Sequence, residues 1–147
     1  MNITVISVGK IKEKYFTAAI DEYSKRLSRF AKLNIIEVAD EKIPDNASEK
    51  EMGQIKEKEG NKILAKLPQN SFVVTLCIEG KEHSSEELAK KIADISMTSS
   101  HITFIIGGSL GLSDTVKSKS ALRLSFGKMT LPHQLMRVVL LEQIYRA

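Results

Sequence analysis

The 147-residue sequence predicts an α/β domain built on a mainly parallel sheet with flanking helices. Short apolar runs typical of buried strands alternate along the chain with longer segments of helical periodicity. Two of the helical segments begin with a capping-box pattern, which marks a helix start. No internal repeat or low-complexity tract interrupts this order. The length suits a single domain over residues 1–147, with one hydrophobic core.

The expected strands are short runs rich in Val, Ile, Leu and Phe. The runs at 71–78 and 102–106 are almost unbroken, as in strands that are covered on both faces of a parallel sheet. Glu79-Gly80 is expected to turn the chain after the first of these two runs. The strands are expected at residues 2–7, 33–38, 71–78, 102–106 and 121–126.

The expected helices lie between these strands. Apolar residues from Phe16 to Phe30 recur every three or four positions, so they share one face, and the aromatic ones are expected in the core. The helices that begin at Ser48 and Ser84 carry the Ser-x-x-Glu capping box. The first of these is so rich in charge that we expect it to be exposed, and Pro68 prevents its continuation. Helices are expected at residues 16–30, 48–66 and 84–95, for a short length from 113, and after Pro132.

The final helix is apolar around most of its circumference rather than along one stripe. In so small a domain the sheet covers only one side of a helix, so a second subunit is expected on the other side. The sequence therefore predicts a homodimer. The apolar residues spread around this helix are Leu135, Met136, Val138, Val139, Leu140, Leu141, Ile144 and Tyr145.

Charge is distributed unevenly along the chain, although the net charge is only +4. Residues 1–32 hold seven Lys/Arg against three Asp/Glu, and residues 115–147 hold six against one. Residues 37–59 hold eight acids against four bases. Basic ends that share a surface suit a polyanionic partner, and solvated helix faces explain the pattern equally well.

The single cysteine, Cys77, excludes an internal disulfide, so we expect a reducing compartment and a place for Cys77 in the core. The start of the chain has no basic leader or cleavage site, and no eighteen consecutive residues are apolar. A cytoplasmic protein without membrane contact is therefore expected. His83, His101 and His133 lack the spacing of metal ligands, so no metal site is expected.

The segment 107–111, Gly-Gly-Ser-Leu-Gly, matches the G-x-S-x-G pattern of serine hydrolases and follows a predicted strand. Asp114 and His133 follow in the order of a catalytic triad. However, Asp114 lies only five residues beyond Ser109, whereas the acid of that fold comes from a later strand end. A glycine turn after a buried strand more often lets a ligand approach the backbone. We therefore favour ligand binding here over hydrolysis.

Three segments after predicted strands qualify as parts of one ligand site, namely 76–80, 106–111 and 126–132. In open α/β sheets, ligands bind at the carboxyl ends of the strands. Leu76, Met129 and Leu131 would form apolar walls. The pattern alone favours ordinary turns over a ligand site. No Walker or Rossmann glycine pattern is present, which argues against a phosphate-binding loop.

The last 22 residues read FGKMTLPHQLMRVVLLEQIYRA. Together with Gly9-Lys10, Glu79-Gly80 and the segment 104–111, they closely resemble the RlmH family. These are SPOUT-class methyltransferases that modify N3 of a pseudouridine in a stem-loop of large-subunit (23S) ribosomal RNA. The resemblance spans nearly the whole chain. It implies a SPOUT-type fold with a carboxyl-terminal trefoil knot, which no periodicity would predict.

The resemblance also implies S-adenosylmethionine as the cofactor and an RNA site that forms across a dimer interface, on ribosomal RNA or the ribosome. It leaves the acceptor of the N3 proton unassigned, so the catalytic residues are unknown. A non-catalytic RNA- or ribosome-binding module that retains the fold is the alternative. The implied cofactor residues are Leu76, Gly108, Gly127, Lys128, Met129, Thr130, Leu131 and Pro132.

Arg137 and Arg146, on the final helix, are expected to contact RNA phosphate. A helix-surface or intersubunit ion pair is the alternative for Arg137. Members of the family continue past the Tyr-Arg-Ala at which this sequence stops, with a basic tail that ends in Tyr-His-Lys. We therefore expect that part of the RNA site lies in residues beyond Ala147.

Overall fold

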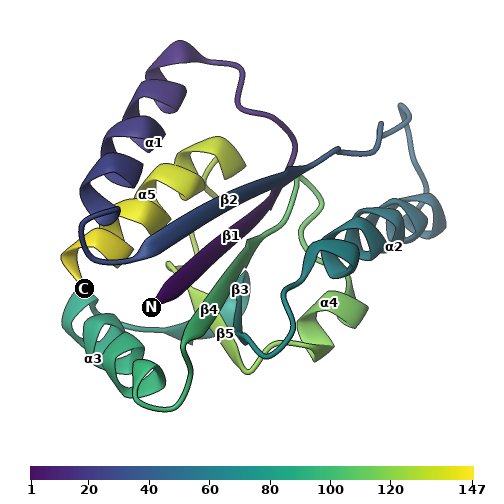
Figure 1. Ribbon diagram of the computed structural model, residues 1–147. Coiled ribbons are helices and arrows are strands. Elements are labelled where there is room, and N and C mark those ends of the chain that lie inside the picture. Colours follow the sequence, from purple (N-terminus) through teal and green to yellow (C-terminus); the bar gives the residue numbers. More distant parts are fainter.

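The computed structural model describes residues 1–147 as a five-stranded sheet with helices on both faces (Figure 1). The strand order is β2-β1-β4-β3-β5, and every pairing within the sheet is parallel. The predicted α/β architecture with a mainly parallel sheet and flanking helices is confirmed. The strands are β1 (Asn2–Val8), β2 (Lys32–Val38), β3 (Phe72–Glu82), β4 (His101–Ile106) and β5 (Leu122–Ser125). The helices are α1 (Lys14–Leu27), α2 (Glu49–Lys66), α3 (Ser85–Ser96), α4 (Asp114–Ser118) and α5 (His133–Arg146).

The core has two halves because successive side chains of a strand point to opposite faces of the sheet. In β1, Ile3 and Val5 pack with residues of α1, α3 and α5. Ile6 and Val8 pack on the other face with Ile63 of α2 and with α4. Figure 1 shows the same division, with α1 and α5 on one face of the sheet and α2 and α4 on the other. Both faces of the central strands are therefore covered, as their unbroken apolar runs predicted.

Strand β3 continues through Glu79-Gly80, so the strand does not end at this position as the sequence predicted. The pairing of β3 with β5 shifts register there, because Leu76 and Lys81 both lie opposite Leu124. A Cβ at position 80 would lie 2.8 Å from the carbonyl carbon of Arg123. The four residues between Leu76 and Lys81 therefore bulge out of the pairing, and glycine allows the close approach of the two strands at this bend.

Helix α2 begins at its predicted capping box, in which the Ser48 hydroxyl accepts a hydrogen bond from the Glu51 amide at 3.1 Å. The prediction that this charged helix is exposed is wrong for one face. Ile55, Glu59 and Ile63 are buried and recur at four-residue spacing. The sequence pattern does not indicate this buried stripe, because a carboxylate occupies its middle position.

Helix α1 ends at Leu27, which is 3% exposed. Phe30 follows the helix end and is 72% exposed, so its predicted place in the core is wrong. Its ring instead lies beside Tyr145 of α5, with 6.4 Å between the ring centroids. No helix of the structure has the length and apolar character needed to cross a membrane.

Candidate functional site

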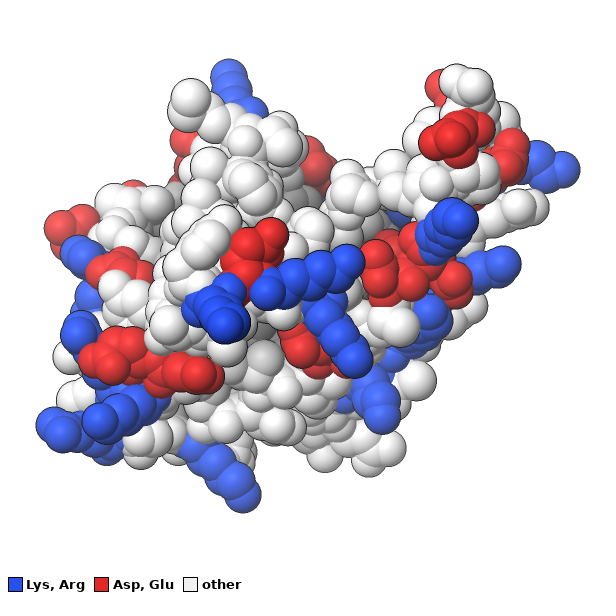
Figure 2. Space-filling model, turned by 90° about the horizontal axis from the view of Figure 1, so that it is seen from above, with Lys and Arg blue, Asp and Glu red and all other residues white.

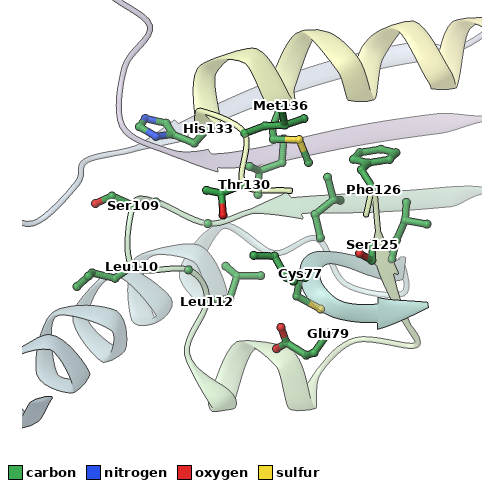
Figure 3. A pocket seen from close by; sticks show the side chains of 18 of the residues that line it. Cys77, Glu79, Ser109, Leu110, Leu112, Ser125, Phe126, Thr130, His133 and Met136 are labelled. Atoms are coloured by element: carbon green, nitrogen blue, oxygen red, sulfur yellow. The ribbon is translucent and has the colours of Figure 1, made fainter. Parts of the chain in front are cut away.

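A cavity of about 700 Å³ lies at the carboxyl ends of β3, β4 and β5 (Figure 3). In Figure 3 the side chains of Thr130 and Met136 lie above the cavity, and those of Cys77 and Glu79 lie below it. The three segments that the sequence singled out meet here, because the parallel strands that precede them end at the same edge of the sheet. Helix α5 and the residues before it cover the cavity from one side, and Lys117 of α4 lies on another.

The glycine segment 107–111 folds back on itself and forms one wall of the cavity, which we call the glycine wall. The Gly111 amide donates to the Gly108 carbonyl at 3.0 Å, and Gly111 has a φ of 85°. A Cβ at Gly107 would lie 2.8 Å from the carbonyl carbon of Gly111, closer than real Cβ atoms come to backbone. This loop therefore requires glycine at position 107. Its backbone faces the cavity without a side chain in between.

The segment 126–132 forms the opposite wall and is anchored at its start by Ser125. The Ser125 hydroxyl accepts a hydrogen bond from the Gly127 amide at 3.1 Å and lies 3.2 Å from the Gly127 carbonyl oxygen. Further along, Met129 is 85% exposed and Leu131 is 37% exposed, although both line the cavity. Apolar side chains at the mouth of a cavity gain by covering an apolar ligand.

A third wall, at the bottom of the cavity in Figure 3, carries an ion pair between Lys117 of α4 and Glu79 of β3. The Lys117 ammonium holds the pKa of Glu79 below its ordinary range, so this carboxylate stays ionised. Cys77 lines the same wall and is partly buried, whereas the sequence placed it in the core. Burial and the neighbouring Glu79 charge raise the pKa of its thiol. The thiol is therefore a poor nucleophile at neutral pH.

His133 begins α5 and lines the cavity. Burial lowers its pKa, and the nearby positive charge of Arg137 acts in the same direction. The imidazole is therefore neutral at neutral pH and presents a lone pair. Ser109 also lines the cavity, but it forms no hydrogen bond with His133, and Asp114 begins α4. These three residues do not form the hydrogen-bonded triad that a serine hydrolase requires.

Most of the residues implied by the resemblance line this cavity, and Lys128 does not. Sequence reasoning missed Lys117 and Met136 as lining residues, whereas Glu79 lies within the predicted segment 76–80. Met136 was hidden by its place among the apolar residues of the last helix. The implied residues found in the lining are Leu76, Gly108, Gly127, Met129, Thr130, Leu131 and Pro132.

The prediction that Arg137 contacts RNA phosphate is wrong, because this residue is only 2% exposed. Its guanidinium donates to the Glu37 carboxylate at 2.6 Å and to the carbonyls of Val8 and Gly9 at 2.9 and 2.7 Å. A group held in this way within its own chain has no free surface for an RNA phosphate. Arg146 is exposed and pairs with Glu142 one helical turn earlier. No group of three or more His, Cys, Asp or Glu side chains is arranged to hold a metal ion.

The whole chain, residues 1–147, matches the model of a protein family described as predicted SPOUT methyltransferase. Among curated proteins, it is 64% identical to ribosomal RNA large subunit methyltransferase H of Clostridium botulinum (strain Kyoto). It is 62% identical to the protein of that name from Clostridium novyi (strain NT). Both matches cover 100% of this chain and 93% of the relative.

Solved structures with little sequence identity share the fold. A tRNA (m1G37) methyltransferase from Aquifex aeolicus matches with a TM-score of 0.56 and 13% identity, over 100% of this chain and 70% of that one. A Legionella pneumophila protein described as a methyltransferase, solved in complex with its cofactor SAM, matches with a TM-score of 0.54 and 13% identity. That match covers 99% of this chain and 66% of the other.

The full-length family match and the relatives at 62–64% identity show that the chain belongs to the SPOUT methyltransferases, and within them to the RlmH family. The resemblance noted in the sequence is thereby confirmed.

Proposed function

We propose that this chain methylates large-subunit ribosomal RNA, with S-adenosylmethionine as the methyl donor. The acceptor is N3 of a pseudouridine in a stem-loop of 23S ribosomal RNA. The observation that carries the proposal is the cavity itself, in which seven of the eight residues implied for the cofactor come together from three separate strand ends. Membership of a methyltransferase family supports the reaction class.

The cavity suits this cofactor in size and in lining. About 700 Å³ lies within the range of roughly 300–1,000 Å³ that small-molecule sites occupy. Leu76, Met129 and Leu131 provide apolar walls for an adenine ring. The loop at Gly107 and Gly108 brings backbone groups close to a ligand without an intervening side chain. When bound, the sulfonium supplies an electrophilic methyl group, which is the chemistry that the protein lacks.

The task of the protein residues is then to hold the reactants in place and to exclude water. N3 of the acceptor must lose its proton during transfer. His133 lines the cavity with a neutral imidazole, but its lowered pKa makes it a weak base. We assign the proton acceptor to no residue of this chain. Positioning supplies much of the acceleration.

The protein acts as a homodimer through the outer face of α5. One face of this helix is buried against the sheet and holds Arg137, Leu140, Leu141 and Ile144. The other face carries Leu135, Val138 and Val139, which remain only partly buried in the single chain. An apolar face of this kind is stabilised by a partner, and the RNA site forms across the interface. Sedimentation at micromolar concentration is expected to give a dimer.

Each subunit is a single SPOUT-type domain over residues 1–147, and the segment around 126–132 belongs to a carboxyl-terminal trefoil knot. The family resemblance supports both statements. A ribosomal RNA substrate supports a location in the cytoplasm, where ribosomes are made. In Figure 2, basic and acidic side chains are interspersed on the face shown, so this face alone offers no uniformly basic RNA surface. Arg146 remains the proposed phosphate contact, because it is exposed near the end of α5.

Calorimetric titration with S-adenosylmethionine tests the proposal. We expect saturable binding with one site per chain, and adenosine alone should bind more weakly because it lacks the methionine portion. A protein that binds ribosomal RNA but not S-adenosylmethionine would contradict the proposal. That result would favour the non-catalytic RNA-binding module.

A further inference from the structure

A buried charged contact joins the last helix to the ends of the first two strands, close to the cavity. Arg137 of α5 donates through Nη1 to Glu37 at the end of β2, and through Nη2 to the carbonyls of Val8 and Gly9 at the end of β1. These partners lie 100 to 129 residues away from Arg137 in the sequence. We call this set, Arg137 with Glu37, Val8 and Gly9, the arginine clasp.

The clasp has the features of a built contact. Its carbonyl acceptors are available because β1 ends at Val8 and the chain turns at Gly9, where φ is 89°. Glu37 also accepts a hydrogen bond from the Ile11 amide at 3.2 Å, so one carboxylate fixes both the turn after β1 and the helix. The Arg137 side chain is 3% exposed. A buried guanidinium requires such partners, because an unpaired charge is costly to remove from water.

The clasp lies beside the glycine wall and beside the first turn of α5, and none of its residues lines the cavity. On the β1 side, the Val8 side chain lies against the glycine wall, where a Cβ at Gly108 would be 3.2 Å from Val8 Cγ1. On the α5 side, His133 lies one helical turn before Arg137 and lines the cavity. His133 Nε2 is 3.8 Å from the position of a Cβ on Gly9. The segment 126–132 leads directly into this first turn of α5.

We propose that Arg137 is a positioning residue for the cofactor cavity, which fixes the start of α5 and the segment 126–132 relative to the glycine wall. The inference rests on the proposed function of the cavity. The planar fork of arginine reaches the carboxylate and both carbonyls at once. A lysine ammonium in the same place is a single point and cannot keep that geometry.

The test compares Arg137→Lys with the unchanged protein in two measurements. The first is the Kd for S-adenosylmethionine by calorimetry, on samples shown to be folded by circular dichroism. The second is hydrogen exchange of the backbone amides of residues 126–136 without ligand. We expect a Kd at least tenfold higher and faster exchange confined to this segment. Arg26→Lys is the matched control, because Arg26 forms an exposed ion pair with Glu22 at 3.0 Å, and it should change neither.

A purely stabilising role for the clasp gives a different result. In that case exchange would rise throughout the chain while the folded Arg137→Lys protein kept its Kd, and the proposal would be overturned. If Arg137→Lys does not fold, the same two measurements are made on Glu37→Gln. This variant removes the charge of the carboxylate but keeps an oxygen acceptor. For Glu37→Gln, a smaller rise in the Kd together with faster exchange of residues 126–136 supports the positioning role of the clasp. No change in either measurement refutes that role. Absence of binding by the unchanged protein would refute the proposed function, whereas the exchange comparison would still test the clasp.

Discussion

At the scale of single residues, Gly107 and Gly53 differ sharply in their surroundings. A Cβ at Gly107 would lie 2.8 Å from backbone of the same loop, whereas a Cβ at Gly53 would meet nothing within 4 Å. We expect Gly107→Ala to raise the Kd for S-adenosylmethionine at least tenfold, because the loop must move to make room. Gly53→Ala should leave binding unchanged and stabilise α2 by about 0.5–1 kcal/mol. Calorimetry and urea unfolding measure the two effects. Equal binding by both variants would show that the glycine loop is not part of the site.

Glu59 gives a prediction about pH. Its carboxylate is buried beside the glycine wall and accepts a hydrogen bond from the Glu41 amide at 3.0 Å. Burial raises the pKa of Glu59, so the folded protein holds this proton more tightly than the unfolded chain does. The resulting stability is present below the ordinary pKa of about 4.5 and is lost as the pH rises through the folded value.

The neutral variant Glu59→Gln should therefore have a higher Tm than the unchanged protein at pH 7.5. The difference should shrink towards zero as the pH falls to about 4, where the glutamate is protonated in both states. Thermal unfolding of both proteins over this pH range measures the difference in Tm. Glu57→Gln on the exposed side of α2 is the control and should show no such trend. A lower Tm for Glu59→Gln at pH 7.5 would mean that the ionised carboxylate stabilises the fold.

At the scale of elements, α5 has an inner and an outer face that should respond differently to substitution. Leu140 is completely buried, so Leu140→Ala should cost about 2–5 kcal/mol of stability. The adjacent Val139 is only partly buried in the single chain, and Val139→Asp should separate the proposed dimer while the subunit stays folded. Sedimentation and circular dichroism distinguish these results. A Val139→Asp protein that remained dimeric would place the interface on another surface.

The elements also show how far the sequence alone determines the fold. Strands with unbroken apolar runs and helices with capping boxes were predicted within a few residues, because these signals are local. The continuation of β3 through Gly80 was missed, since it depends on the distant strand β5, whose Leu124 pairs with Lys81. The buried stripe of α2 was missed for a related reason. Only tertiary packing shows that the Glu59 carboxylate belongs on the inner side.

The candidate site was predicted better in its backbone than in its side chains. The glycine segments could be located because they follow buried strands, and seven of the eight implied cofactor residues line one cavity. Arg137 illustrates the limit of sequence reasoning. A basic residue on a helix is usually solvated, and nothing nearby in the sequence indicates that its partners are Val8, Gly9 and Glu37.

At the scale of the whole molecule, the proposed RNA binding depends on charge. The net charge of +4 arises from basic segments at both ends of the chain. We expect the affinity for a ribosomal RNA stem-loop to fall linearly with the logarithm of salt concentration. Arg146→Gln should reduce the slope by about one, because one phosphate contact is lost. Fluorescence titrations at several salt concentrations measure the slope. A slope that does not depend on salt would contradict an electrostatic RNA surface.

Labelled S-adenosylmethionine tests methyl transfer to ribosomal RNA most directly. The protein is incubated with 23S ribosomal RNA or ribosomes that carry either pseudouridine or uridine at the modified stem-loop. We predict incorporation of the label at N3 of pseudouridine, and much less incorporation when uridine takes its place. The Gly107→Ala protein serves as the impaired comparison. No incorporation into any of these substrates by a protein that binds S-adenosylmethionine would contradict the account.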